Sequence, residues 1–258
     1  MMKKLFLCLT FLLSVGNAYA NISIFPYSVD FEAKARKRVQ SVRVINTSDE
    51  THTYRVSVIN YLQSQDGKLT ETAEKKPYFA KPYLTFSPRQ FTLNPGEVQT
   101  INVARKSLSK APDGEFVSHL KISEISLGKP KINDNAKATT LSIDIKALFA
   151  VTLPVTIAKG ETLLSKTILV SHKRAANNNL ELTLRRLGNV SSRVNVAIID
   201  STTQKEIGRV NGVKIYMSTD DLTFNVPLDK GTETVKSAVL KIEDAKSKEE
   251  ISKQAISL

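Results

Sequence analysis

Short stretches in which apolar and polar residues alternate run along much of the chain. In the first half, such stretches cover residues 40–45, 53–59, 91–93 and 98–103, and residues 116–125 form a further expected strand of mixed pattern. Side chains of a β-strand point alternately to the two faces of a sheet, so this pattern predicts half-buried strands. No window shows the apolar spacing of an amphipathic helix, and only residues 68–76 are expected to form a short helix or a loop. The chain is predicted to be all-β.

A second alternating series follows residue 160. It covers residues 166–171, 180–187, 193–200, 212–216, 222–228 and 238–243. Strands at this spacing, separated by glycine and proline turns, are typical of a sandwich of two antiparallel sheets. Two such domains are therefore expected, with residues 21–157 in the first and residues 158–258 in the second. The polar stretch 128–140 is predicted to be a long loop.

The first twenty residues are typical of a cleavable signal peptide. Lys3 and Lys4 precede an apolar run over residues 5–15, and Ala18-Tyr19-Ala20 provides small residues for a cleavage site. Eleven apolar residues are too few to cross about 30 Å of hydrocarbon, which argues against a membrane anchor. We expect cleavage after Ala20 and export of a chain that begins at Asn21.

Composition excludes several classes of protein. Hydrophobic residues make up 41% of the chain and charged residues 24%, a balance that is typical of a folded protein. The single cysteine, Cys8, lies in the predicted signal peptide, which excludes a disulfide scaffold in the exported chain. Lysine and arginine outnumber the acidic residues by 37 to 25, but they are scattered and do not alternate with aromatic residues. A nucleic-acid partner is therefore not expected.

The sequence offers little for catalysis. The three histidines, His52, His119 and His172, have no second ligand at metal spacing and no nucleophile nearby in the sequence. None of the common hydrolase, nucleotide-binding or zinc motifs occurs. We expect no enzyme activity, no metal or other cofactor, and no small-molecule substrate.

The longest alternating stretch ends the first predicted domain. Every odd-numbered position from 141 to 157 is apolar: Leu141, Ile143, Ile145, Ala147, Phe149, Val151, Leu153, Val155 and Ile157. Seventeen extended residues would span about 56 Å, whereas strands usually contain 3–10 residues, so one small domain cannot cover them all. The run is also compatible with two shorter strands that break near Pro154.

Such a strand, at the end of its domain, is expected at the edge of a sheet. Long apolar edges invite aggregation, and exported proteins normally protect them. One reason to keep such an edge is that another polypeptide pairs with it through main-chain hydrogen bonds and side-chain pockets. Five donated side chains would contribute roughly 10 kcal/mol before ordering costs.

Four short motifs, in order along the chain, resemble those of a known family. They are SPRQFTLNPGEVQTI at 87–101, DGEFVSHL at 113–120, VTLPV at 151–155 and RLGN at 186–189. In this combination, the chain resembles the PapD-like periplasmic chaperones of chaperone–usher pilus assembly, and is closer to their archaic or alternative branch.

The resemblance implies two immunoglobulin-like domains in a boomerang arrangement. It also implies a periplasmic protein that binds pilus subunits by donor-strand complementation and passes them to an outer-membrane usher. The donated side chains would be Leu141, Ile143, Ile145, Ala147, Phe149 and Val151. Whether the free protein caps this strand by forming a dimer or oligomer is left open.

The family also has a lysine and an arginine that hold the carboxylate at the end of the subunit. Lys146 matches the lysine by its place in the strand, although it is equally compatible with an ordinary solvent-facing residue. The arginine has no match, because residues 21–31 contain no basic side chain. Arg89, Arg36 and Arg38 are the candidates to replace it.

A second hypothesis remains beside the chaperone. The chain is also compatible with a two-domain structural or adhesive surface module, in which the long strand is buried within its own fold.

Overall fold

The computed structural model describes residues 22–125, 148–175 and 177–258. The first half of the chain contains β1 (Ile22–Phe25), β2 (Val29–Phe31), β3 (Val39–Asn46), β4 (His52–Gln63), β5 (Leu69–Thr72), η2 (Lys81–Tyr83), β6 (Leu84–Ser87), β7 (Gln90–Leu93), β8 (Val98–Arg105), β9 (Gly114–Ile125) and β10 (Ala150–Lys159). The second half contains β11 (Ser165–Ala175), β12 (Asn179–Gly188), β13 (Ser192–Asp200), β14 (Glu206–Ile215), β15 (Asp221–Pro227), β16 (Ser237–Asp244) and β17 (Glu250–Ser257).

The strands of the first half form two sheets. One has the order β1-β3-β8-β6, and the other has the order β2-β10-β9-β4-β5, with β7 also paired to β4. Alternate side chains of the two sheets meet in one apolar core, which includes Val42, Ile101, Leu120 and Val155. The two sheets and this core form the first domain.

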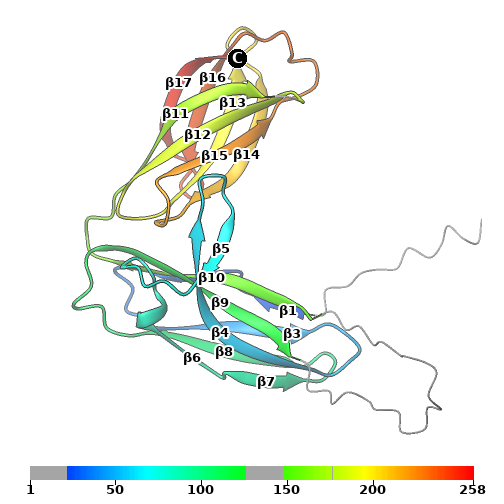
Figure 1. The fold of residues 1–258 in the computed structure, drawn as a ribbon, viewed down its shortest axis with the longest axis vertical. Helices are drawn as coiled ribbons and strands as arrows, with labels where there is room; N and C mark the ends of the chain where they lie inside the picture. Colours follow the sequence, from blue (N-terminus) through cyan, green and yellow to red (C-terminus); the bar gives the residue numbers. More distant parts are fainter. Residues whose placement is uncertain (1–21, 126–147, 176) are drawn as a thin grey trace, which may run out of the picture.

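The strands of the second half form a separate sandwich with its own core. The orders are β11-β12-β15 and β14-β13-β16-β17. Leu180, Leu182, Ile198, Ile215 and Leu240 lie fully buried between these sheets. The prediction of an all-β chain with two sandwich domains is confirmed. The domains meet at an angle, and the connection between β10 and β11 crosses the bend (Figure 1).

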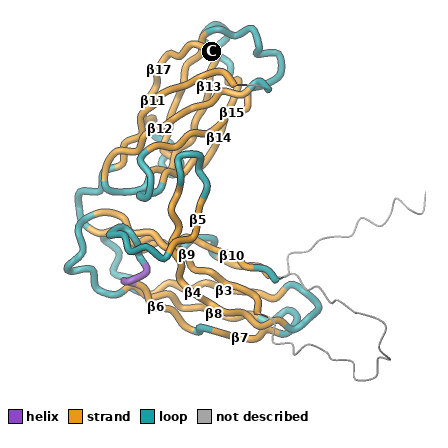
Figure 2. Tube along the Cα trace, viewed as in Figure 1, coloured by secondary structure: helices purple, strands orange, loops and turns teal. Residues whose placement is uncertain are grey.

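The hairpin formed by β4 and β5 leaves the first domain and reaches the second (Figure 2). Its turn lies at Ser64–Lys68, where the Gly67 N–H donates to the Ser64 carbonyl at 2.9 Å. Gly67 has a positive φ of 83°, a conformation that glycine adopts without strain. We call residues 63–67 the arm turn.

The prediction of a helix or loop at residues 68–76 is wrong in part, because β5 occupies Leu69–Thr72. The strand is short and three of its four residues are exposed, so it has no apolar face that could produce an alternating pattern. Its pairing to β4 across the arm turn explains why it forms. The short strands β1, β2 and β6 and the C-terminal β17 were not predicted.

The predicted signal peptide at residues 1–20 and the predicted loop at 128–140 lie outside the described residues. Within the described ranges, no helix has the length and apolar character needed to cross a membrane.

Candidate functional site: the open edge of strand β10

The two halves of β10 have different neighbours. Over its whole length β10 pairs antiparallel with β9, from Ala150 opposite Ser123 to Lys159 opposite Gly114. On its other side, β2 pairs with Val155–Ile157 only. Among the described residues, no strand pairs with Ala150–Pro154 on that side. We call this first half of the strand the open edge of β10.

The hydrogen-bonding groups of the open edge follow from the register with β9. The Glu124 N–H donates to the Phe149 carbonyl at 2.8 Å, so residues 149 and 124 form a hydrogen-bonded pair. Such pairs alternate along an antiparallel ladder. The N–H and carbonyl groups of Ala150 and Thr152 therefore point away from β9, as an incoming strand would require.

The odd-numbered side chains of β10 pass from the core of the first domain into solvent. Leu153 is 2% exposed, and Val155 and Ile157 are fully buried. The same row continues with Val151, which is 37% exposed, and Phe149, which is 56% exposed. All five side chains lie on the same face, but only Leu153, Val155 and Ile157 are covered by the opposite sheet. The sequence predicts this shared face, and the structure shows where its cover ends.

A groove of about 480 Å³ lies between the open edge of β10 and strand β1. Its lining is largely apolar and consists of Ile22, Ser23, Ile24, Tyr27, Thr47, Val151, Thr152 and Leu153. Strand β1 is the last strand of its own sheet. Strand β1 and the open edge of β10 therefore lie on the same side of the first domain, with the groove between them.

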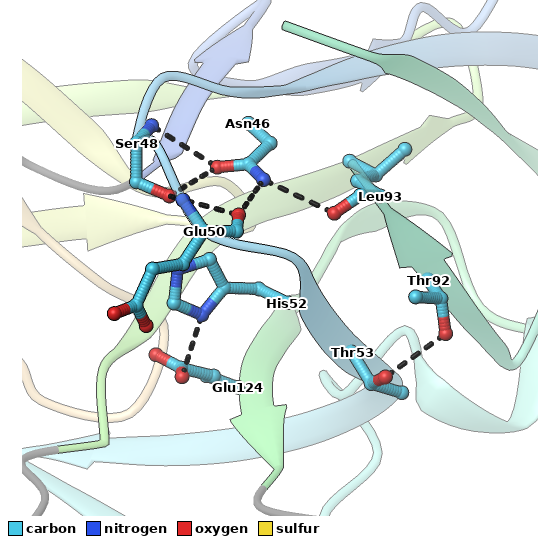
Figure 3. A network of polar contacts seen from close by, with 8 residues as sticks. All are labelled: Asn46, Ser48, Glu50, His52, Thr53, Thr92, Leu93 and Glu124. Atoms are coloured by element: carbon cyan, nitrogen blue, oxygen red, sulfur yellow. Dashed lines mark hydrogen bonds and ion pairs between the residues drawn. The ribbon is translucent and has the colours of Figure 1, made fainter. Parts of the chain in front are cut away.

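A buried polar network closes the adjacent end of the domain (Figure 3). His52 Nδ1 and Glu124 Oε1 are 2.8 Å apart, and each side chain is 3% exposed. Next to them, the Asn46 side-chain amide donates to the carbonyls of Glu50 and Leu93 at 2.7 and 3.1 Å. Burial, together with the charge of Glu124, raises the pKa of Tyr54 to about 12. The backbone N–H of Glu124 also donates to the Phe149 carbonyl, so the network lies next to the start of β10.

Comparison with known proteins gives a likeness of fold. No family model matches the sequence, and no curated protein matches it. Among solved structures, the class 5 fimbriae chaperone CfaA is 16% identical, with a TM-score of 0.47 over 92% of this chain and 98% of that chain. By fold, this chain resembles chaperones of fimbriae and pili.

Two further structures show the same likeness. The Salmonella enterica SafB chaperone in complex with the SafA pilin gives a TM-score of 0.49 at 12% identity, over 93% of this chain and 97% of that chain. The CsuC–CsuE chaperone–tip adhesion subunit complex of the archaic chaperone–usher Csu pili of Acinetobacter baumannii gives 0.44 at 16% identity, over 80% and 90%. The likeness concerns the overall fold.

The candidate residues from the sequence fall into three groups. Val151 lies in the open edge, and Phe149 lies immediately before it. Leu141, Ile143, Ile145, Ala147 and Lys146 lie outside the described residues. The three arginines are all exposed, and the structure does not bring them together with the open edge.

Arg89 lies on the opposite side of the domain from the open edge. It stands between β6 and β7, and β7 pairs with β4, which is separated from β10 by β9. Strand β7 is therefore three strand spacings, or roughly 14 Å, away from β10. The Arg89 guanidinium instead lies over the Phe86 ring, 5.4 Å from its centroid.

Arg36 and Arg38 lie on the connection between β2 and β3, near the second domain. On the same connection, Glu32 lies 3.7 Å from Lys246 of the second domain. Since β2 pairs with the end of β10, the connection is displaced from Val151 by about six residues, or roughly 20 Å.

Two lysines at the domain junction were not predicted from the sequence to be of interest. Lys159 follows the apolar row at the next odd position; its Nζ donates to the Ala111 carbonyl and lies 3.8 Å from Asp113 Oδ1. Lys214 Nζ lies 4.5 Å from the centroid of the Tyr216 ring, and burial lowers its pKa. The first could have been found as the charged residue that ends the row. The second depends on packing between the domains, which the sequence pattern does not contain.

Within the described parts of the chain, no cluster of three or more His, Cys, Asp or Glu side chains could hold a metal ion.

Proposed function

We propose that this protein is a periplasmic chaperone of pilus assembly that holds a pilus subunit by lending it the open edge of β10. The observation that carries the proposal is the exposure of Phe149 and Val151 on the same face as the buried Leu153. A subunit whose own sandwich lacks a strand would pair with Ala150 and Thr152 and would cover these side chains. The apolar positions Leu141, Ile143, Ile145 and Ala147 would extend the same row.

The proposed partner would cover both the outward main-chain groups of the open edge and the apolar side chains of Phe149 and Val151. Main-chain pairing satisfies the outward N–H and carbonyl groups, and burial removes apolar surface from water. Covering the exposed parts of Phe149 and Val151 would contribute roughly 1–2 kcal/mol for each side chain. The structural or adhesive module, in contrast, requires this strand to be buried in its own fold, and the exposure of these two residues disfavours that hypothesis.

The finer steps of the proposal follow the resemblance in the sequence motifs. The signal peptide at residues 1–20 would direct export and would be removed after Ala20. The bound subunit would then pass to an outer-membrane usher. In this scheme the chain acts by binding alone and uses no cofactor.

The test compares two exposed valines. The subunit is first identified by co-purification of the native protein from periplasmic extract and is then co-expressed with each variant. We expect Val151→Asp to abolish recovery of the subunit, because a carboxylate would be buried in the subunit's groove. Val170→Asp in β11 is the matched control, since Val170 is 45% exposed.

Both variants are expected to fold, which thermal unfolding and circular dichroism check. Recovery of the subunit by Val151→Asp at the level of Val170→Asp would contradict the donor role of β10. A Phe149→Asp variant repeats the test at the more exposed position.

A further inference from the structure

The arm turn reaches the outer edges of both sheets of the second domain. Strand β14 ends one sheet and β15 ends the other. Exposed sheet edges carry unpaired main-chain groups, which proteins normally cover. Here a hairpin of the first domain covers part of both edges.

Gln63 binds the backbone at the end of β14 with both ends of its side-chain amide. Its Nε2 donates to the Lys214 carbonyl at 2.9 Å, and its Oε1 accepts from the Tyr216 N–H at 2.8 Å. The amide therefore makes the two bonds that a neighbouring strand would make with residues 214 and 216. The Gln63 N–H adds a third bond, to Ser218 Oγ at 2.9 Å.

Gln65 makes the corresponding contact with β15. The Thr223 N–H donates to the Gln65 carbonyl at 2.7 Å, which adds one residue of the arm turn to the edge of that strand. A side chain at Gly67 would place its Cβ 3.3 Å from Leu222 Cδ1, so the arm turn lies directly against the second domain.

Aromatic side chains pack beneath the arm turn. His119 of β9 lies edge-on to Tyr61, with ring centroids 4.8 Å apart, and its centroid is 5.9 Å from that of Tyr216 in the second domain. Gln63 itself is 8% exposed. Its hydrogen bonds are therefore shielded from water. Losing one of them would cost more free energy than losing a hydrogen bond at the surface, because the partner group would stay buried and unpaired.

A second attachment joins the domains through Asn189. Its carbonyl accepts from the Glu115 N–H of β9 at 2.9 Å, and its side chain binds the backbone of Thr162 and Leu164 in the interdomain connection. The exposed pair of Lys246 and Glu32 adds little, because solvent screens it. The arm turn and Asn189 thus join the domains at two separate points, and each attachment opposes rotation of the domains about the other.

We propose that Gln63 is a positioning residue that fixes the angle between the two domains. The angle determines where the second domain stands relative to the open edge of β10, and therefore which subunits fit between them. The link to subunit binding rests on the proposed function, whereas the fixed angle does not.

The angle can be measured by the distance between spin labels in the two domains. The only native cysteine is Cys8 in the predicted signal peptide, so labels can be placed at will in a Cys8→Ser background. Thr100→Cys in β8 and Lys253→Cys in β17 are exposed positions, one in each domain. Pulsed electron paramagnetic resonance then gives the distribution of distances.

Gln63→Leu removes the amide, and Gln40→Leu is the matched control. Gln40 donates its side-chain amide to the Asp30 carbonyl at 3.2 Å within the first domain. We expect a narrow distribution for the native chain and for Gln40→Leu, and a broader, shifted one for Gln63→Leu. Gln63→Glu keeps the acceptor for the Tyr216 N–H and is expected to give an intermediate width.

Two results would overturn the positioning role: a broad distribution in the native chain, or a distribution in Gln63→Leu as narrow as in Gln40→Leu. This measurement needs no subunit, so its outcome is independent of the proposed function. With the subunit present, we expect Gln63→Leu to recover less of it than Gln40→Leu does. Equal recovery would overturn the link between the angle and binding.

Discussion

Burial at the domain junction changes the chemistry of His119. The side chain lies between Tyr61 and Tyr216, and its Nδ1 has no hydrogen-bond partner among the described residues. Burial, and to a smaller extent the charge of Lys214, lowers the pKa of His119 from 6.5 to about 4. The imidazole is therefore neutral at pH 7 and packs as an aromatic ring.

This pKa predicts how stability depends on pH. Between pH 6.5 and about 4 the unfolded chain binds a proton at His119 that the folded chain does not, so folding becomes less favourable as the pH falls through this window. The full effect of His119 is roughly 3 kcal/mol. Denaturant unfolding at pH 7 and pH 4 measures it. His119→Phe should lose less stability on acidification than the native chain and than His172→Phe, and equal losses in all three would contradict the assignment.

Sequence patterns identified some residues of the candidate site and of the domain junction but not others, for a physical reason. Phe149 and Val151 were found because strand alternation places them in one row with the core residue Leu153. Gln63 and Lys214 were not found, because they are polar residues about 150 positions apart whose contact exists only once the two domains pack. Neither position departs from an ordinary surface pattern in the sequence.

At the level of elements, the register of β10 predicts that proline destabilises the chain by different amounts at two neighbouring positions. The Thr152 N–H points to the open edge, whereas the Val151 N–H points to Ile122 of β9. Proline removes one N–H and is tolerated where that group does not serve the ladder. Thr152→Pro should therefore change the free energy of unfolding by less than about 1 kcal/mol, and Val151→Pro should cost roughly 1–3 kcal/mol more.

Chemical denaturation of the two proline variants measures this difference. Thr152→Pro should also weaken subunit recovery, because it removes a donor from the proposed interface. Equal destabilisation by both variants would mean that the Thr152 N–H does not face the open edge.

The strands differed in how well the sequence predicted them. Strands β3, β8 and β12 each bury one face, so an alternating pattern marks them clearly. Strands β1, β2 and β5 contain four residues or fewer, too few to establish a period of two. They form because neighbouring strands offer them an edge, which is a property of the assembled sheet.

At the scale of the whole molecule, the two cores share no residue. A cavity in one of them should therefore leave the other intact. Leu182→Ala in β12 is expected to destabilise the second domain by about 2–5 kcal/mol. Hydrogen–deuterium exchange should become faster in β12, β13 and β16, while β4 and β9 of the first domain keep their rates except next to the junction. Faster exchange throughout β4 and β9 would show that the domains unfold as one unit.

The two-domain architecture was predicted because each sandwich produces its own series of alternating stretches. The angle between the domains could not be predicted from the sequence pattern, since the contacts across the junction are made by the arm turn, by Asn189 and by His119 packed against Tyr216. These contacts join residues that lie far apart in the sequence.

Pro154 stands at the border between the two halves of β10. Its ring nitrogen occupies the place on the outer side where the next donor after Thr152 would be. A guest strand advancing along β10 would meet no N–H there, and one residue further it would meet β2. If a subunit strand pairs with the open edge of β10 as proposed, Pro154 would mark the end of that pairing, and the pairing of β10 with β2 would stay intact.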